Sequence, residues 1–336
     1  MDKFNIPVVL FLFKRAEKAA LILDRISLIA PSKIYLIADG PRFVEEEEEV
    51  VKCRKVVEEH IKWECEIIRN YADENRGVYN NIAGGAKWVF EREDFAIFLE
   101  DDNMPELSFF QFCQEMNIKY KDDTRILWIC GTNYLKKYKF PNNASYYFTQ
   151  HMMPCGWASW GYKFNKFYDG ELDLWEESYT RDIINKLSYY SPLKEQDINN
   201  WNRELRRKHN GLRFDSWDYQ MSFTLRVHNL YGIVPKYNQI KNIGVDANSI
   251  HGGTSFDNVM TQRFCGLSTY PLDFPLVHPS ILSIDPIYEK RTACIITLPL
   301  SLRLKAKIAM FIKRILGCDP DLSLSKQIRK KIGFSK

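Results

Sequence analysis

The chain has 336 residues, 45% of them hydrophobic and 14% aromatic, which is enough to bury a large core in one large domain or two closely packed ones. Its net charge of +4 is uneven, because residues 297–336 contain ten Lys or Arg against two Asp, a net of +8, which leaves −4 for residues 1–296. Eight scattered cysteines without a CxxC pair argue against a zinc ribbon or a small disulfide scaffold, and no apolar stretch reaches the roughly 20 residues of a membrane span.

Four apolar, β-branched runs at the start of the chain predict buried strands, and the stretches between them have helical periodicity. Each run is continuously hydrophobic rather than alternating, which is typical of strands covered on both faces. Strands that alternate with helices predict an α/β fold with a doubly wound, mostly parallel sheet. The predicted strands are residues 7–13, 33–38, 64–69 and 95–100, and the predicted helices are residues 16–30, 45–60 and 80–90. The glutamates at 45–49 lie at a helix start, where negative charge is favourable, and we expect them to be solvated.

Polar residues follow each predicted strand. They are Lys14-Arg15, Asp39-Gly40, Arg69 with Asn75-Arg76-Gly77, and Glu100-Asp101-Asp102. In a parallel sheet these carboxyl ends lie at one edge, where ligands gather. The chain has neither GxGxxG after the first strand nor GxxxxGK[ST] anywhere, so a glycine-rich phosphate loop is not predicted. Three consecutive carboxylates repel one another unless water or a cation lies among them, which favours a metal ion as the phosphate holder.

The second half of the chain is more irregular. It contains five of the eight tryptophans between Trp157 and Trp217, and it is predicted to form an α+β portion over the sheet edge, with residues 188–202 at the surface. We therefore predict an α/β half over residues 1–150, an α+β half over residues 151–296, and a basic tail over residues 297–336.

Four sequence elements in this order carry a resemblance to a known family. They are LEDD at 99–102, MPCGWASWGYKF at 153–164, FDSWDYQMSF at 214–223 and NIGVDANSIHGG at 242–253. Over roughly residues 5–255 the chain resembles bacterial family-2-like glycosyltransferases of the GT-A fold, which use nucleoside-diphospho-sugar donors and are similar to N-acetylglucosaminyltransferase I. A departure is the Lys14-Arg15 pair, where the family often has Asn-Arg or Arg-Pro.

The resemblance implies a metal and nucleotide site. LEDD looks like the DxD-type element, in which Asp102 binds a Mn²⁺ or Mg²⁺ ion that bridges the donor diphosphate, while Glu100 and Asp101 face the ribose and the metal's waters. His251 is the second implied metal ligand. The nucleoside pocket is implied to include Asp39, Arg69, Asn75 and Arg76. The alternatives are an acidic turn before a helix at residues 106–120 and a structural histidine.

The resemblance also implies a sugar site and a general base. Gly156 would let the backbone approach the donor sugar, and Trp157 and Trp160 would stack on sugar faces; alternatively both tryptophans belong to the core. Asp218 matches the base of inverting enzymes, with Asp215 as the second candidate, because a hydroxyl that attacks an anomeric carbon must lose its proton to a nearby group. Either aspartate could instead cap a helix at residues 217–228.

The predicted function is therefore an inverting, divalent-metal-dependent glycosyltransferase. It would move a sugar from a UDP-sugar or similar donor to a hydroxyl of a glycan or lipid-linked glycan, in bacterial surface polysaccharide synthesis, and no nucleic-acid partner is expected. The alternatives are a catalytically inactive binding protein of the same fold and a magnesium-dependent phosphatase or phosphotransferase. Phosphatases of that class usually place an aspartate after the first strand, where this chain has Lys14-Arg15.

The basic tail has an amphipathic pattern. Its apolar residues at helical spacing are Leu304, Ile308, Phe311, Ile312 and Ile315, with basic residues beside them. Such a helix can lie in an anionic membrane interface or pack on the core with a solvated basic face. We expect a cytoplasmic protein that binds peripherally at the inner face of the membrane.

Overall fold

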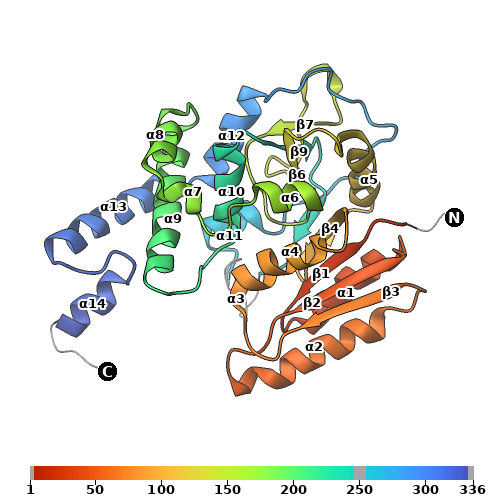
Figure 1. Cartoon of the computed structure of the whole chain (residues 1–336), viewed down its shortest axis with the longest axis horizontal. Coiled ribbons are helices and arrows are strands. Elements are labelled where there is room, and N and C mark those ends of the chain that lie inside the picture. The colour runs from red at the N-terminus through yellow and green to blue at the C-terminus, as the bar shows by residue number, and fades with distance from the viewer. Residues whose placement is uncertain (1–3, 246–254, 332–336) are drawn as a thin grey trace.

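The computed structural model describes residues 4–245 and 255–331. An eight-stranded sheet runs through the body of the molecule in the order β3-β2-β1-β4-β8-β6-β9-β7 (Figure 1). The strands are β1 Val8–Leu12, β2 Lys33–Ala38, β3 Glu66–Tyr71, β4 Phe95–Glu100, β6 Ile126–Cys130, β7 Tyr146–Thr149, β8 Trp157–Trp160 and β9 Tyr231–Pro235. Strands β3, β2, β1 and β4 are mutually parallel, whereas β8 is antiparallel to both of its neighbours. Strands β6 and β9 are parallel, and β7 pairs antiparallel with β9.

Helices cover both faces of this sheet, as the continuous apolar strands require. Alternate residues of β1 divide between two cores: Val8 and Leu10 face one side, and Val9 and Phe11 face the other. The first face packs against α1 Ala16–Ser27, α2 Glu47–His60 and α5 Ser108–Tyr120. The second packs against α3 Gly77–Tyr79, η2 Asn80–Gly84, α4 Gly85–Phe90, α6 Gly161–Phe167, α10 Asp218–Val227 and α12 Pro286–Ile296. The predicted α/β fold with a doubly wound, mostly parallel sheet is confirmed.

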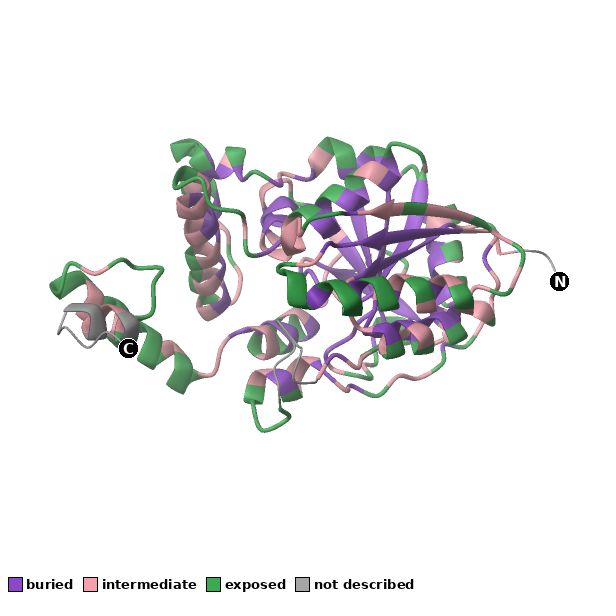
Figure 2. Cartoon of the chain, turned by 90° about the horizontal axis from the view of Figure 1, so that it is seen from below, coloured by how far each residue is buried: buried purple, intermediate pink, exposed green. Residues whose placement is uncertain are grey.

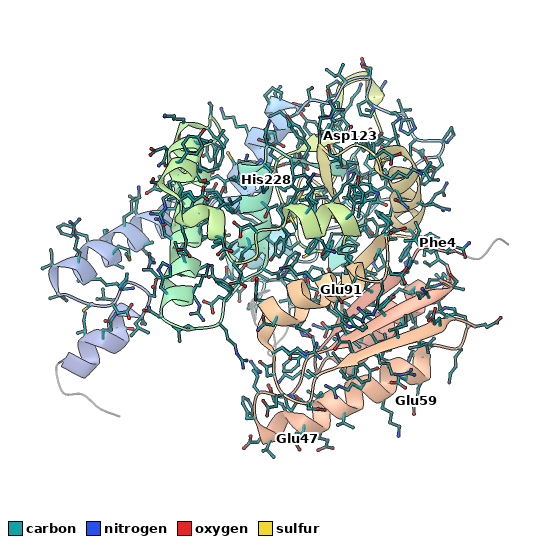
Figure 3. The ribbon with its side chains drawn as sticks, viewed as in Figure 1. Phe4, Glu47, Glu59, Glu91, Asp123 and His228 are labelled. Atoms are coloured by element: carbon teal, nitrogen blue, oxygen red, sulfur yellow. The ribbon has the colours of Figure 1, made fainter. Side chains whose placement is uncertain are left out.

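The predicted elements of the first third agree closely with the structure. Two of the four strands have the predicted bounds, and the other two differ by one or two residues at their ends. One prediction about the glutamates is wrong. Glu47 and Glu59, at opposite ends of α2, are exposed (Figure 3), but Glu46, in the 3-10 helix η1 Val44–Glu46, is buried and pairs with Lys14 and Arg42.

A smaller helical layer packs beside the sheet. It consists of α7 Asp173–Glu176, α8 Ser178–Lys186 and α9 Ser191–His209, which pack on α10 through a separate apolar cluster that includes Trp175, Trp201 and Phe223. The segment predicted to lie at the surface, residues 188–202, thus contributes a buried tryptophan to this layer. The predicted boundary at residue 150 falls inside the single sheet, because β8 and β9 pair with β6.

Six further elements complete the described chain. A two-stranded antiparallel sheet joins β5 Asn103–Pro105 to β10 Ile240–Asn242, directly after β4. The remaining helices are η3 Pro141–Asn143, α11 Val259–Phe264, α13 Leu300–Ile315 and α14 Leu324–Lys331. Helices α13 and α14 extend away from the sheet beyond α9 (Figure 1). Within residues 4–245 and 255–331, no helix is both long enough and apolar enough to cross a membrane.

Candidate active site

The carboxyl ends of β3, β2, β1 and β4 bring the predicted polar residues to one edge of the sheet. After β1, the Lys14 ammonium lies 2.9 Å from Glu46 and 3.2 Å from Glu49. Glu46 also binds the Arg42 guanidinium, and this pairing lowers the pKa of the Glu46 carboxyl to about 2. Glu46 therefore holds the chain after β1 and the chain after β2 together, a role that the run of five glutamates did not reveal.

Asp39 organises the turn at residues 75–77. Its Oδ1 accepts hydrogen bonds from the backbone N–H of Gly40 (2.9 Å) and Arg76 (2.6 Å). Its Oδ2 accepts from the Asn75 side chain (3.0 Å) and from the Gly77 N–H (3.1 Å). Burial raises the pKa of Asp39, while these backbone hydrogen bonds oppose the rise. Four donors use the accepting capacity of the carboxylate, so Asp39 holds the turn at 75–77 in place at this edge of the sheet.

Three consecutive carboxylates at the end of β4 form an acidic cluster, and Arg15 pairs with two of them. The Arg15 guanidinium, from the start of α1, lies 2.7 Å from Asp102 Oδ2 and 3.4 Å from Asp101 Oδ1. Asp101 and Asp102 are both buried. Burial, followed by the charge of Asp102, raises the pKa of Asp101 to about 7 against the opposing effect of Arg15. Burial and the charges of Asp102 and Asp101 also raise the pKa of Glu100. Burial and mutual repulsion thus favour the protonated forms of Glu100 and Asp101, and Arg15 offsets these effects only in part.

The sheet of β5 and β10 supports Asp102 from the other side. Asn103 and Asn242 are register partners in it, and both side-chain amides donate to Asp102 Oδ1, at 2.6 Å and 3.4 Å. The Ile243 N–H donates to the Asp102 carbonyl at 2.8 Å. Gly244 lies so close that a Cβ there would overlap the Asp102 carboxylate. Asn103 and Asn242 were missed by the sequence analysis, although Asn242 opens the predicted NIGVDANSIHGG element.

The described residues do not form a complete set of protein ligands for a divalent cation. Among them, no three His, Cys, Asp or Glu side chains are grouped to hold a metal ion. Mg²⁺ is commonly held by one or two carboxylates together with substrate phosphates and waters, so a complete protein cage is not required. Asp102, the carboxylate that the resemblance assigns to this role, is engaged by Arg15, Asn103 and Asn242. Added positive charge would oppose the burial and repulsion that raise the pKa values of Glu100 and Asp101. His251, the other predicted ligand, lies outside the described residues.

The segment that precedes α10 contacts Asn75 and Tyr79, beside the turn at 75–77. Arg213 donates to the Asn75 carbonyl at 2.7 Å, and the Phe214 ring packs on Tyr79 with centroids 4.7 Å apart. At its other end, the Tyr168 hydroxyl donates to the Trp217 carbonyl at 3.1 Å. These contacts join the segment before Asp218, the first residue of α10, to the turn at 75–77 and to Tyr168.

The two candidate bases have different surroundings. The charge of Asp218 is among those that raise the pKa of Glu100, so the two carboxylates interact electrostatically. The Ser216 hydroxyl donates to Asp218 Oδ1. Asp215 is exposed, and Arg207 pairs with it at 2.8 Å. Asp215 therefore lies at the surface beside α9, whereas Asp218 is only partly exposed and its charge acts on Glu100.

The tryptophans predicted to stack on sugar lie in the core instead. Trp157 is buried between Phe98 (3.9 Å between ring centroids) and Trp128 (4.2 Å), and it also contacts Trp217 at 5.6 Å. Trp160 is buried as well. The prediction of sugar stacking is wrong for both, because neither ring offers a face to a ligand. Trp157 instead supports Trp217 and hence the start of α10.

Two other predicted residues also have structural surroundings. Gly156 adopts a positive φ of 61°, and a Cβ there would overlap Ile240, so its glycine is required by packing against β10. Arg69 lies within β3, and its guanidinium pairs with Glu58 of α2 at 2.9 Å. Arg69 is therefore held by α2 and not by the turn at 75–77. The Arg76 guanidinium, from that turn, donates to the Asn70 side chain at 2.7 Å.

A cavity of about 190 Å³ opens beside the acidic cluster, beyond β1. It is lined by Lys14, Arg15, Ala16, Glu17, Lys18, Glu49 and Lys52. Four of these seven residues are basic and two are acidic, and both Lys14 and Arg15 are paired with carboxylates. The Lys14-Arg15 pair, where the resembled family often has Asn-Arg or Arg-Pro, therefore lines this cavity.

The chain matches no protein-family profile, and a search of curated proteins found no match. Among solved structures it is similar to 4-diphosphocytidyl-2C-methyl-D-erythritol synthase from Anaerococcus prevotii, at 11% identity over 71% of this chain and 92% of that chain, with a TM-score of 0.35. It is also similar to the glycosyltransferase GlyE of Streptococcus pneumoniae, at 10% identity over 70% of this chain and 55% of that chain, with a TM-score of 0.27. At these TM-scores neither likeness carries a functional conclusion.

Proposed function

We propose that this chain is an inverting glycosyltransferase that moves a sugar from a nucleoside diphosphate donor to a hydroxyl group of a glycan or lipid-linked glycan. The observation that carries the proposal is the meeting of three separate segments at one sheet edge. These are the Asp39-held turn at 75–77, the acidic cluster at 100–102, and Asp218 at the start of α10. These contacts and charge interactions support a site built from residues that the sequence spreads over more than half the chain.

Each segment has a distinct task in this proposal. The turn at 75–77 holds the nucleoside, and the basic cavity beyond β1 receives charge of the diphosphate. Asp218 accepts the proton of the acceptor hydroxyl as that oxygen attacks the anomeric carbon from the face opposite the leaving diphosphate. Since Ser216 already donates to Oδ1, we assign proton acceptance to Oδ2. The acceptor oxygen gains the bond to the sugar, and the donor's glycosidic phosphate oxygen keeps the electron pair.

We also propose that a Mn²⁺ or Mg²⁺ ion assists the reaction. Asp102 would hold it, with Asp101 and Glu100 adding negative charge nearby, and the ion would neutralise the leaving diphosphate. Arg15 now pairs with Asp102, so binding of the ion requires the guanidinium to move or to share the carboxylate.

The central test compares two aspartate variants. Asp218→Asn should lower sugar transfer by on the order of 10² or more, because a positioned proton acceptor contributes on that scale, while donor binding persists. Asp215→Asn is the matched control, and it should retain transfer because that side chain pairs with Arg207 at the surface. Loss of transfer in Asp215→Asn alone would move the base, and full activity in both variants would refute the assigned mechanism.

Ligand and product measurements test the reaction class. A thermal-shift screen of nucleotides and nucleotide sugars, with and without Mn²⁺, should show selective stabilisation by one diphosphonucleoside, because a ligand of the native state stabilises it by mass action. NMR of the product should show an anomeric configuration opposite to that of the donor. Stabilisation without transfer or hydrolysis would instead identify a binding protein, and phosphate release from simple esters would identify a phosphatase.

A further inference from the structure

Helix α13 presents a continuous apolar face to solvent. Five large apolar side chains on it are each between 51% and 67% exposed, and none of its residues is buried. They are Leu300, Leu304, Ile308, Phe311 and Ile315. Figure 2 shows α13 as a largely exposed helix that projects from the body of the molecule. Soluble monomers rarely expose contiguous apolar patches of this kind without a binding role.

The spacing of these residues makes them one stripe. At 100° per residue, positions 300, 304, 308, 311 and 315 fall within roughly a quarter of the helix circumference. Leu302 and Met310 lie on the other side of the helix, where they are less exposed, at 39% and 47%. The face is thus a property of the helix surface and not of isolated residues.

Positive charge borders the stripe on both sides. Helix α13 contains five basic residues and no acidic residue. By the same helical geometry, Lys307 and Arg314 lie along one border, and Lys305 lies beyond Ile312 along the other. Apolar side chains flanked by long basic side chains are the arrangement of helices that lie in the interface of an anionic bilayer.

Ion pairs fasten the tail to the body without covering the stripe. Lys307 lies 2.7 Å from Glu195 at the start of α9, and Asp321, in the segment after α13, lies 2.7 Å from Arg206 near the end of α9. These two contacts orient α13 relative to the α7–α9 layer. The apolar stripe remains exposed beside them.

We propose that α13 docks the protein on an anionic membrane surface, with its apolar stripe inserted at the boundary of headgroups and acyl chains. The charge decides the partner: an apolar protein groove would satisfy the stripe alone, whereas anionic lipid satisfies the stripe and its basic borders together. This docking does not depend on the proposed reaction, and its test measures binding and not transfer.

The test is cosedimentation of the full chain with lipid vesicles. Binding to vesicles of phosphatidylglycerol and phosphatidylcholine should exceed binding to phosphatidylcholine alone, and it should weaken as salt shortens the screening length from about 10 Å at 0.1 M to about 3 Å at 1 M. Ile308→Ser with Phe311→Ser should lower the partition coefficient by on the order of tenfold or more, because it removes apolar area and leaves the charge unchanged. The matched control, Leu302→Ser with Met310→Ser, removes apolar side chains from the other side and should bind nearly as the parent does.

Two further measurements make the outcomes decisive. Near-ultraviolet circular dichroism should be the same for both double variants, because all four positions are at least partly exposed. Lys305→Gln with Arg314→Gln should reduce the preference for anionic vesicles. Equal loss of binding in both serine variants, or no binding of the parent, would overturn the proposal. A parent dimer that Ile308→Ser with Phe311→Ser converts to monomers, with vesicle binding unchanged, would show that a second copy covers the stripe and would also overturn it.

Discussion

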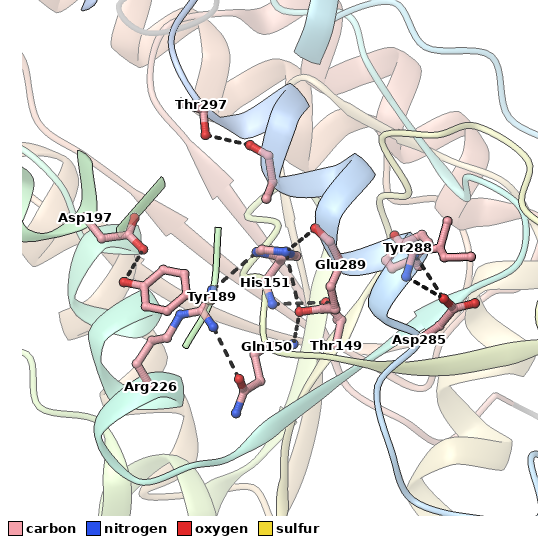
Figure 4. A network of polar contacts seen from close by, with 12 residues as sticks. Thr149, Gln150, His151, Tyr189, Asp197, Arg226, Asp285, Tyr288, Glu289 and Thr297 are labelled. Carbon is pink, nitrogen blue, oxygen red and sulfur yellow. Dashed lines mark hydrogen bonds and ion pairs between the residues drawn. The ribbon is translucent and has the colours of Figure 1, made fainter. Parts of the chain in front are cut away.

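Replacing the buried Asp197 with asparagine should stabilise the protein in a pH-dependent manner. Asp197 lies in α9, and its Oδ2 accepts a hydrogen bond from the Tyr189 hydroxyl at 3.2 Å (Figure 4). The Arg226 guanidinium stacks on the same tyrosine, 3.9 Å from the ring centroid. Burial raises the pKa of Asp197 from 3.8 to about 6, although Arg226 and the tyrosine hydroxyl oppose the rise. The folded protein therefore resists ionisation of this group.

The magnitude follows from the shift. Roughly two pKa units at about 1.36 kcal/mol each correspond to about 3 kcal/mol. Because the folded-state pKa lies above the unfolded-state value, the folded chain holds the extra proton between pH 3.8 and about 6, and the free energy of unfolding falls as pH rises through that window. Asparagine resembles the protonated carboxyl, so Asp197→Asn should match the parent below pH 3.8 and exceed its unfolding free energy by up to about 3 kcal/mol above pH 6.

Urea titrations followed by tryptophan fluorescence between pH 3.5 and 8 measure this difference directly. Asp182→Asn, which removes an exposed carboxylate from the neighbouring helix α8, is the control for a general change in net charge. A difference between Asp197→Asn and the parent that is the same at pH 4 and pH 8 would refute the reasoning. So would a variant that is less stable than the parent above pH 6.

Two other substitutions test neighbouring features. Gly244→Ala should abolish the stabilisation by a nucleotide sugar in a thermal-shift assay, because the added Cβ would displace the Asp102 carboxylate. The control is Gly84→Ala, which has open space around its Cβ and should bind normally. Normal binding by both variants would contradict the role of Asp102. His151→Gln should reduce the loss of unfolding free energy that the parent shows below about pH 6.5. Burial lowers the pKa of His151, so in that pH range the unfolded chain binds a proton at His151 that the folded chain does not. The prediction is contradicted if the urea midpoint changes between pH 5 and pH 8 by the same amount in the variant and the parent.

Much of the fold of the first 100 residues could be predicted, because the sequence patterns that specify it are local. Each of β1, β2 and β4 is a continuous apolar run, and burial on both faces requires that pattern wherever the strand lies in the sheet. The chain order of strands and helices then places the polar residues after each strand at one edge. Asp39, Asp101 and Asp102 were located in this way before any contact was known.

The second half, residues 151–296, was less predictable, because contacts between distant residues specify its structure. Strand β8 lies antiparallel between β4 and β6, an insertion that no local pattern in WASW reveals. Tryptophan is a residue type that can stack on sugars, but Phe98 and Trp128 cover the two faces of the Trp157 ring. Arg69 lies within β3 and not after it, and its guanidinium pairs with Glu58 of α2.

The sequence by itself determined the class of the fold, the acidic edge and the amphipathic basic tail, because each depends on residue order within a short segment. Only the tertiary structure decided which of these residues meet. It pairs Arg15 with the acidic cluster, holds Asp102 through Asn103 and Asn242, and pairs Asp215 with Arg207 at the surface. The physical reason is that burial, charge pairing and the saturation of a carboxylate such as Asp39 depend on groups far away in the chain. Their distances exist only after the sheet and its helices have packed.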